Sequence, residues 1–363
     1  MKEQKANTQN GIALPVDLIR TIAIILVILL HASIEPNPNI SQMSPEGVQL
    51  FWVSNVYNSI SRTAVPLFVM LTGALLLQPT KQNEPLRLFF RKRWNRIGLP
   101  VLFWGAIYFA YDFTIKGNPL TITSFLQGIL AGPYVHFWYL YLLIGLYLIT
   151  PLIRVLVAHA NWILMKYFLL LWLVGTGIVS LLTLNAPISS QAAWFESNVF
   201  ILTGIVGYFI LGAYVNKLQT RLTYLCLGLA VGTLSTILTT YFVIGHLGEA
   251  YSQFFLTANS ITVIVASITL FLIIASVSHQ KIEAKNPKAN KIIHVISENT
   301  LPIYLFHIIV LETLQSGVLG FTLSVTTMNP ILEIPLTTFI TLMICLAIIV
   351  PLKKLPYVKN IIG

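Results

Sequence analysis

DLIRTIAIILVILLH, residues 17–31, predicts an apolar helix with chargeable side chains only near its ends, Asp17 and Arg20 at one end and His31 at the other. Eleven residues separate Arg20 from His31, which is three helical turns and a small remainder, so the two side chains share one face about 16 Å apart along the axis. Chargeable groups are costly in lipid, so this face should look toward a protein interior or a water-filled cavity.

The composition of the whole chain predicts a polytopic membrane protein. Of its 363 residues, 56% are hydrophobic and 9% are charged, whereas about a quarter of the residues are charged in a soluble protein. The two cysteines, Cys226 and Cys345, both fall in apolar stretches. They are interpreted as small core residues, and we expect neither a disulfide nor a metal site.

We expect an all-α fold of about ten membrane-spanning helices that form a single domain over residues 15–355. A disordered cytoplasmic tail, 1–14, precedes this domain, a second cytoplasmic tail, 356–363, follows it, and residues 124–133 form a re-entrant or interfacial piece. The expected spans are roughly 16–34, 50–78, 97–115, 136–153, 162–184, 197–215, 222–245, 254–277, 297–318 and 331–352.

The positions of the basic residues predict the orientation of these spans. With both termini in the cytoplasm, all but two of the 22 Lys and Arg residues lie on the inner side. The exceptions are Lys116, in an outer loop, and Arg62, within a span. The net charge of +10 is thereby explained by topology, which makes anionic lipid the expected partner and argues against nucleic acid.

Two of the polar residues inside the predicted spans are candidates for chemistry. His31 could be a buried neutral histidine bonded to a neighbouring helix, but the cost of burial in a membrane favours a functional role. Arg62 lies in the outer half of the second span, just before Pro66. It could be an arginine that reaches to the outer interface, or a clamp on a carbonyl oxygen or an anionic substrate.

Two further stretches carry polar side chains at helical spacing. In RKRWNRIGLP, residues 91–100, Arg93 and Arg96 share a helical face and could grip phosphates, although basic residues there also serve as plain topology determinants. In SENTLPIYLFHIIVLE, residues 297–312, Thr300, Tyr304 and His307 form one stripe on one face. A second buried histidine one turn from a tyrosine is hard to explain by packing alone.

Residues near the predicted outer boundary could contact an acceptor. His136 and Trp138 begin the fourth span; an aromatic belt explains the rings, while a carbohydrate site would use their faces as platforms. Glu196 lies in an outer loop and could orient a histidine or contact the substrate.

The chain resembles the acyltransferase-3 family of integral membrane acyltransferases. Arg20, ten intervening residues and His31 resemble the signature of that family. Thr72 before Gly73 is a mild departure, because family members often have serine there. Further similarities occur in family order at SRTAVPLFVMLTGALLL (61–77), RWNRIGLPVLFW (93–104), HFWYLYLLIGLYLITPLI (136–153), GIVGYFILGAYV (204–215) and SENTLPIYLFH (297–307).

The resemblance implies transfer of an acetyl or other short acyl group from cytoplasmic acetyl-CoA or another acyl-CoA to a hydroxyl of a cell-surface or lipid-linked glycan. The chain is most similar to the stand-alone type that acetylates surface polysaccharides, which implies the bacterial plasma membrane. Arg20, Arg93 and Arg96 would bind the CoA phosphates. His31 would act as a general base or carry the acyl group, with Arg62, Tyr304 and His307 as further catalytic candidates.

Two other classes of function remain open at this point. A transporter or flippase for a lipid-linked glycan or a small molecule would also place charges inside ten helices, and it predicts substrate flux without acyl chemistry. A sensor or structural membrane protein would tolerate loss of His31 and Arg62. Acyl-CoA hydrolysis or transfer by the purified protein separates these classes. The acceptor glycan and the oligomeric state are left open.

Overall fold

The computed structural model describes residues 15–33, 44–117, 119, 121–182, 204–218, 220–247, 255–277, 286–323, 328–356 and 358–363. Within these ranges the regular elements are all helices, as expected for an all-α fold. The predicted tail 1–14 and Glu196 lie outside the described residues.

Most of the longer helices follow the predicted apolar stretches in chain order. The helices 86–93 and 287–298 lie instead in basic segments between those stretches, and the span expected at 50–78 consists of two helices. The longer helices are α1 (Val16–Ala32), α2 (Pro45–Ser61), α3 (Ala64–Leu76), α4 (Leu86–Arg93), α5 (Leu99–Thr114), α6 (Ile122–Ala131), α7 (Trp138–His159), α8 (Trp162–Leu173), α11 (Ile205–Ala213), α12 (Leu222–Leu247), α14 (Ile261–Ser276), α16 (Pro287–Glu298), α17 (Thr300–Gln315) and α18 (Pro330–Leu352). Two short ones, α9 (Ser180–Leu182) and α19 (Val358–Ile362), complete the set in the described ranges.

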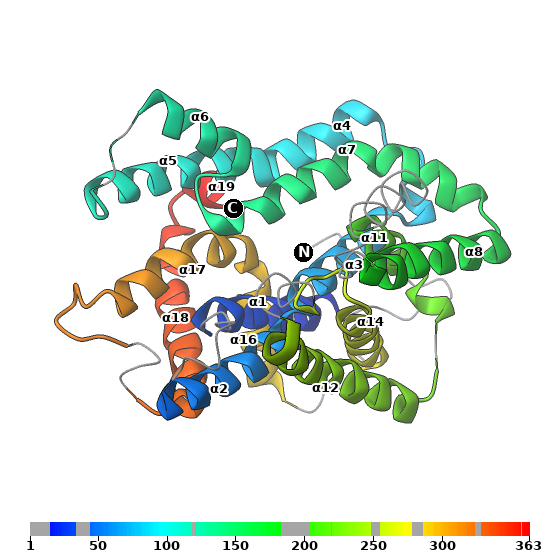
Figure 1. Ribbon diagram of the computed structural model, residues 1–363. Helices are drawn as coiled ribbons and strands as arrows, with labels where there is room; N and C mark the ends of the chain where they lie inside the picture. The colour runs from blue at the N-terminus through cyan, green and yellow to red at the C-terminus, as the bar shows by residue number, and fades with distance from the viewer. Residues whose placement is uncertain are drawn as a thin grey trace.

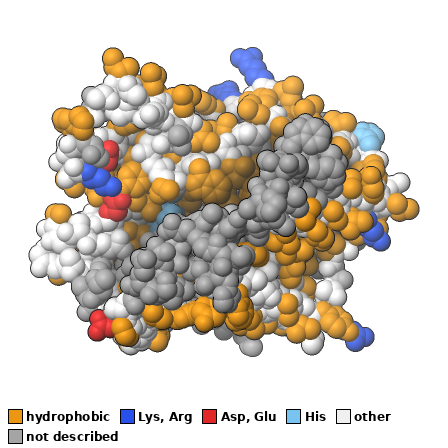
Figure 2. All heavy atoms as spheres, viewed as in Figure 1, with side chains coloured by type: hydrophobic (Ala, Val, Ile, Leu, Met, Phe, Trp, Pro, Cys, Tyr) orange, Lys and Arg blue, Asp and Glu red, His pale blue; other side chains and the backbone are white. Residues whose placement is uncertain are grey.

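Several of these helices are long and apolar enough to cross a membrane. Five continuous helical stretches of the described chain qualify, and a sixth is formed if α16 and α17, bent by 77° at their junction, count as one span. The five continuous stretches are residues 45–76, 86–114, 122–159, 222–242 and 330–352. Figure 2 shows a face dominated by hydrophobic side chains, with few charged ones. The chain is therefore a multi-pass membrane protein, while the number ten stays a prediction.

Helix α1 lies at the centre of the molecule. It packs against α2, α3, α14, α16, α17 and α18, and Figure 1 shows it between α17 and α18 on one side and α3, α11 and α14 on the other. Ile19, Ala23, Ile24, Val27 and Ile28 are almost fully buried, and their helical spacing spreads them over about half of the helix circumference. An apolar helix enclosed in this way is a core element that can carry polar side chains away from lipid.

Helices α3 and α11 cross at very short distance because both have glycine at the crossing. A Cβ added to Gly73 would lie 1.8 Å from the Phe209 carbonyl oxygen, and one added to Gly212 would lie 1.9 Å from the Met70 carbonyl oxygen. Small residues allow this close approach in membrane helix pairs. The crossing holds α3, and with it one wall of the cavity described below.

The C-terminal residues 358–363 are packed onto the membrane domain. Ile362 in α19 is buried, and its carbonyl oxygen accepts a hydrogen bond of 3.2 Å from Trp104 Nε1 of α5. Nothing in the polar sequence around this segment predicted that contact, because it depends on a partner more than 250 residues away.

Candidate active site

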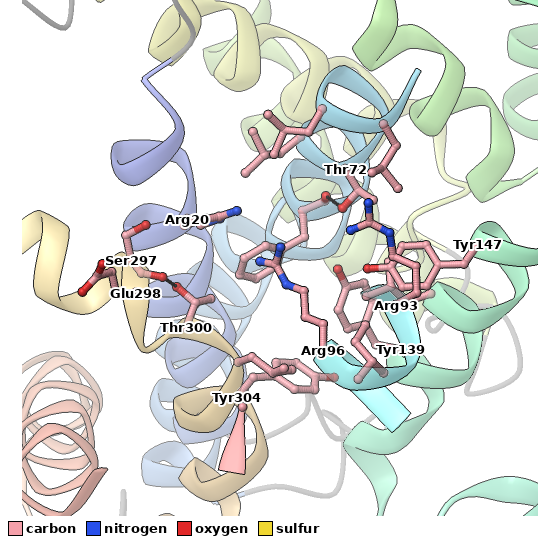
Figure 3. Close-up of a pocket in the computed structure, with 18 of the residues that line it drawn as sticks. Arg20, Thr72, Arg93, Arg96, Tyr139, Tyr147, Ser297, Glu298, Thr300 and Tyr304 are labelled. Atoms are coloured by element: carbon pink, nitrogen blue, oxygen red, sulfur yellow. Dashed lines mark hydrogen bonds between the residues drawn. The ribbon is translucent and has the colours of Figure 1, made fainter. Parts of the chain in front are cut away.

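A cavity of about 320 Å³ lies between α1, α3, the α4–α5 junction, α7 and the bend from α16 to α17. Its walls carry four cationic side chains, Arg20, Lys81, Arg93 and Arg96, and one carboxylate, Glu298. Figure 3 shows the three arginines pointing toward one another across the cavity. The structure therefore brings together the three residues that the sequence suggested for phosphate binding. Such an excess of positive charge suits an anionic ligand.

The two arginines of the α4–α5 junction are placed by a local change of helix type. Arg93 ends α4, and Arg96 lies in the π-helical turn Trp94–Gly98 that connects α4 to α5. A single π-helical turn shifts the register of a helix and is frequent at functional sites. The guanidinium of Arg93 lies 5.1 Å from the ring centre of Phe89 and 5.5 Å from that of Tyr147, within cation–π range.

A clasp of Glu84, Lys92 and Arg154 fixes this segment against α7. The buried Arg154 donates from Nε to the Leu76 carbonyl oxygen at 2.8 Å and pairs through Nη2 with Glu84 at 3.1 Å. Lys92 pairs with the same carboxylate at 2.9 Å. Partial burial alone would raise the pKa of Glu84, but the hydrogen bonds from Lys92 and Arg154 and their charges hold it below its ordinary value. The sequence identifies Arg154 only as one of the basic residues that mark the inner side. Its ion pair with Glu84 is not predicted.

Aromatic side chains line the rest of the cavity. Tyr139 and Tyr147 project from α7, and Phe68 lies on α3, with the rings of Phe68 and Tyr139 at 6.1 Å. Tyr139, Leu143 and Tyr147 follow one another at every fourth residue of α7. That spacing places them on one face and could have identified them from the sequence.

Three histidines from three separate elements meet beyond the cavity. The ring centres of His31 in α1 and His307 in α17 are 5.2 Å apart. His136, in the short turn Val135–Phe137 before α7, lies 5.4 Å from His307 and 5.6 Å from Tyr304. His31, His136, Tyr304 and His307, four of the predicted site residues, thus form one cluster, which we call the histidine cluster; His31 is half-buried in it and the other three are buried.

A backbone hydrogen bond sets the tautomer of His307. Its Nδ1 lies 2.6 Å from the Tyr304 carbonyl oxygen, and because a carbonyl oxygen only accepts, Nδ1 carries the hydrogen. In the neutral ring Nε2 then has the lone pair. That atom is buried and has no hydrogen-bond partner among the described residues. In the neutral ring, this nitrogen of His307 is therefore the one that can accept a hydrogen bond.

Tyr304 connects the cavity to the histidine cluster. It lines the cavity (Figure 3), and its ring centre lies 5.7 Å from that of His307. Its hydroxyl donates to the His136 carbonyl oxygen at 2.5 Å, so this hydrogen already has an acceptor. Among the described residues that line the cavity, Tyr304 is the member of the cluster; His31 itself lies beyond it.

Arg62 lies next to the cluster at the C-terminal end of α2. Its Nε donates to Asn58 Oδ1 at 2.8 Å, and its charge is close enough to His31 to interact with it electrostatically. Arg62 thus places a positive charge beside the histidine cluster.

The structure does not bring His136 and Trp138 to one surface. His136 is fully buried, whereas Trp138 is 49% exposed, with its ring near Tyr139 at 6.3 Å. The residues diverge because the turn Val135–Phe137 ends between them and α7 begins at Trp138.

In the described part of the chain no group of three or more His, Cys, Asp or Glu side chains has an arrangement that could hold a metal ion.

Comparison with known proteins decides the family. Residues 15–350 match the acyltransferase-3 family, described as an acyltransferase domain. This chain belongs to the acyltransferase-3 family. Neither a curated protein nor a solved structure matches it. The match covers nearly the whole chain, so the acyltransferase domain includes both the cavity and the histidine cluster.

Proposed function

We propose that this membrane acyltransferase moves an acetyl or other short acyl group from cytoplasmic acyl-CoA to a hydroxyl of a cell-surface or lipid-linked glycan, in the plasma membrane of a bacterium. The observation that carries the proposal is the junction at Tyr304, where a cation-lined cavity meets the histidine cluster. The distribution of Lys and Arg supports a cytoplasmic position for the cavity end.

The donor would bind with its phosphates at Arg20, Arg93 and Arg96. Guanidinium groups form charge-assisted hydrogen bonds with phosphate, and three of them on one cavity suit the several phosphates of CoA. The pantetheine arm would extend along the aromatic wall of Phe68, Tyr139 and Tyr304 toward the histidine cluster. The thioester would then lie between the cavity end and the opposite end of the membrane domain.

The chemistry would proceed in one of two ways. In direct transfer, the imidazole of His31 or His307 takes the acceptor hydroxyl proton while the oxygen attacks the thioester carbonyl. The C–S bond then breaks, and the leaving CoA thiolate receives the proton. In the covalent route, a ring nitrogen of His31 attacks the thioester carbonyl, the C–S bond breaks, and the leaving CoA thiolate takes the proton of the other ring nitrogen. The acceptor oxygen then attacks the acyl group, the bond between the acyl carbon and His31 breaks, and the hydroxyl proton returns to His31. In both routes Arg62 would stabilise the oxyanion.

The test uses the purified full-length protein with acetyl-CoA labelled in its acetyl group. Label should pass to a hydroxyl-bearing glycan, and mass spectrometry of surface glycans should show an acyl mass that disappears when the gene is removed. Flux of a lipid-linked glycan across vesicles without any acyl transfer would refute the proposal and favour a transporter.

A further inference from the structure

A stripe of buried polar side chains on α18 has no role in the site described so far. Glu333, Thr337 and Thr341 stand at every fourth residue and therefore on one face of the helix. They are 1%, 2% and 0% exposed. Each has an oxygen with no hydrogen-bond partner among the described residues: Oε2 of Glu333 and Oγ1 of both threonines. Thr338, by contrast, donates to the Ile334 carbonyl oxygen at 2.8 Å.

A second polar stripe lies on α2 and leads to the catalytic region. Ser54, Asn58 and Arg62 also follow at every fourth residue, and Ser54 and Asn58 are buried. Asn58 Nδ2 donates to Ser33 Oγ at the end of α1 at 3.4 Å, and Arg62 donates to Asn58. The Ser54 hydroxyl has no partner in the described part of the chain.

The two helices that carry these stripes pack against each other and against α1. The Tyr57 hydroxyl of α2 donates to the Ile331 carbonyl oxygen of α18 at 2.7 Å, and α1, α2 and α18 pack pairwise. We call Ser54, Asn58, Glu333, Thr337 and Thr341 together the polar track. Buried polar groups without partners are expensive in a membrane protein, so the four that Ser54, Glu333, Thr337 and Thr341 carry on these two helices are not explained by packing.

The depth of the polar track can be compared with that of His31. Asp17, at the start of α1, accepts a hydrogen bond from Ser297, and Lys353, at the end of α18, donates one to the carbonyl oxygen of Glu298, the residue after Ser297. The start of α1 and the end of α18 therefore lie at the same height along the helix axes. At 1.5 Å per residue His31 lies about 21 Å from Asp17, and Thr341 and Thr337 lie about 18 and 24 Å from Lys353. The two threonines therefore bracket the depth of His31. Glu333, about 30 Å away, lies further toward the end opposite the arginine cavity.

We propose that the polar track binds the hydroxyl groups of the acceptor glycan and directs one of them to His31. Threonine and serine hydroxyls, an amide and one carboxylate match the alternating donors and acceptors of a sugar. The cavity, with four cations, suits a phosphorylated donor instead. The donor thus enters at one end of α1 and the acceptor at the other. This inference rests on the proposed function and extends it to the acceptor side.

The experiment compares isosteric variants of the track with a matched control on the same helix. Thr337→Val, Thr341→Val and Glu333→Gln keep the side-chain volume and remove or weaken hydrogen-bonding capacity. Thr338→Val is the control, because its hydroxyl is bonded within α18. Labelled acetyl-CoA is the donor, and methyl glycosides of hexoses and N-acetylhexosamines are the acceptors, of which the best substrate of the unmodified protein is used.

The expected result is a rise in acceptor KM without a change in acetyl-CoA binding. Each threonine variant should raise that KM by about five-fold and Glu333→Gln by more than ten-fold, with Thr338→Val unchanged. An unchanged acceptor KM in all three track variants, in a protein that still transfers label, would overturn this inference alone. Transfer to no hydroxyl acceptor by the unmodified protein would overturn the proposed function and this inference with it.

Discussion

The hydrogen bond from His307 Nδ1 to the Tyr304 carbonyl oxygen places the hydrogen of the neutral ring on Nδ1 and leaves the lone pair on Nε2. A single backbone acceptor fixes which ring nitrogen is free, and the ring of His31 lies 5.2 Å away. Under the proposed function, one of these two imidazoles can act as the base for acyl transfer and the other as the acyl carrier.

Replacement of His31 or His307 by alanine should therefore reduce acyl transfer about 100-fold or more, because general base or nucleophilic catalysis is lost. The measurement is transfer of labelled acetyl, with expression and membrane insertion checked in parallel. His159→Ala is the matched control, since that histidine is exposed and bonds the Val155 carbonyl oxygen away from the site. Full activity in both variants would exclude both mechanisms.

Arg93 and Arg96 are predicted to act on donor binding. Replacing either by glutamine should weaken acyl-CoA binding by about ten-fold or more, because a charge-assisted hydrogen bond to phosphate is lost. Isothermal titration with a non-hydrolysable acyl-CoA analogue measures this. Arg91→Gln is the control, since Arg91 lies on the same helix, is exposed and does not line the cavity. Equal affinities in all three variants would remove the assignment.

The ion pair of His294 and Asp17 gives the protein a pH-dependent stability. The hydrogen bond from His294 Nδ1 to Asp17, 2.8 Å long, is the main cause of a raised pKa at His294, against a smaller effect of burial. A raised folded pKa stabilises the protein fully below the unfolded value of about 6.5, and this contribution is lost as pH rises through the folded pKa.

We therefore expect His294→Ala to lower the thermal unfolding midpoint more at pH 6 than at pH 9, in detergent at constant ionic strength. Asp17→Asn should give the same pattern, because it removes the partner of the same pair. A larger loss at pH 9 than at pH 6 would show that the stabilising form of His294 is the neutral one.

At the scale of elements, the crossing of α3 and α11 positions the cavity wall. Gly73→Ala and Gly212→Ala should each lower the thermal midpoint by several degrees, because the added methyl group would overlap a backbone carbonyl and force the helices apart. The control is Gly145→Ala in α7, where no heavy atom lies within 4 Å of the added Cβ. Equal midpoints for all three variants would contradict the tight crossing.

Helical periodicity predicted much of this arrangement. Arg20 and His31 are on one helix at the predicted spacing, and Tyr304 and His307 come one turn apart on α17. What periodicity could not supply are contacts between elements. The Arg154–Glu84 clasp, the turn that separates His136 from Trp138 and the docking of Ile362 each depend on distant partners or on a local change of helix type.

At the scale of the whole molecule, the site has two chemically different ends along α1. The end near Arg20 is cationic and aromatic, and the region beyond His31 is lined by hydroxyls, an amide and a carboxylate. Under the proposed function, the membrane domain would keep a charged donor and an uncharged acceptor apart until both reach the histidine cluster. Composition alone predicted a membrane protein but could not predict this division.

The bend between α16 and α17 also has an electrostatic consequence. Because a new helix begins at Thr300, the N-terminal end of α17, with its partial positive charge, lies at the wall of the arginine cavity. Pro302 in this first turn has no N–H group, so fewer backbone donors there need a partner. The C-terminal end of α16, with its partial negative charge, lies at the same wall through Ser297 and Glu298, so the two helix ends offset each other and the combined field of the four cationic side chains dominates.

This combined field should make donor capture depend on ionic strength. The dissociation constant for acyl-CoA is expected to rise steadily between about 0.05 and 0.5 M salt, as the Debye length shortens, while the KM for a neutral glycan stays constant. Titrations across that range measure both. A donor affinity independent of salt would mean that contacts other than phosphate hold the donor. Under the proposed function, the four cationic side chains around this bend would draw the anionic donor toward the cavity.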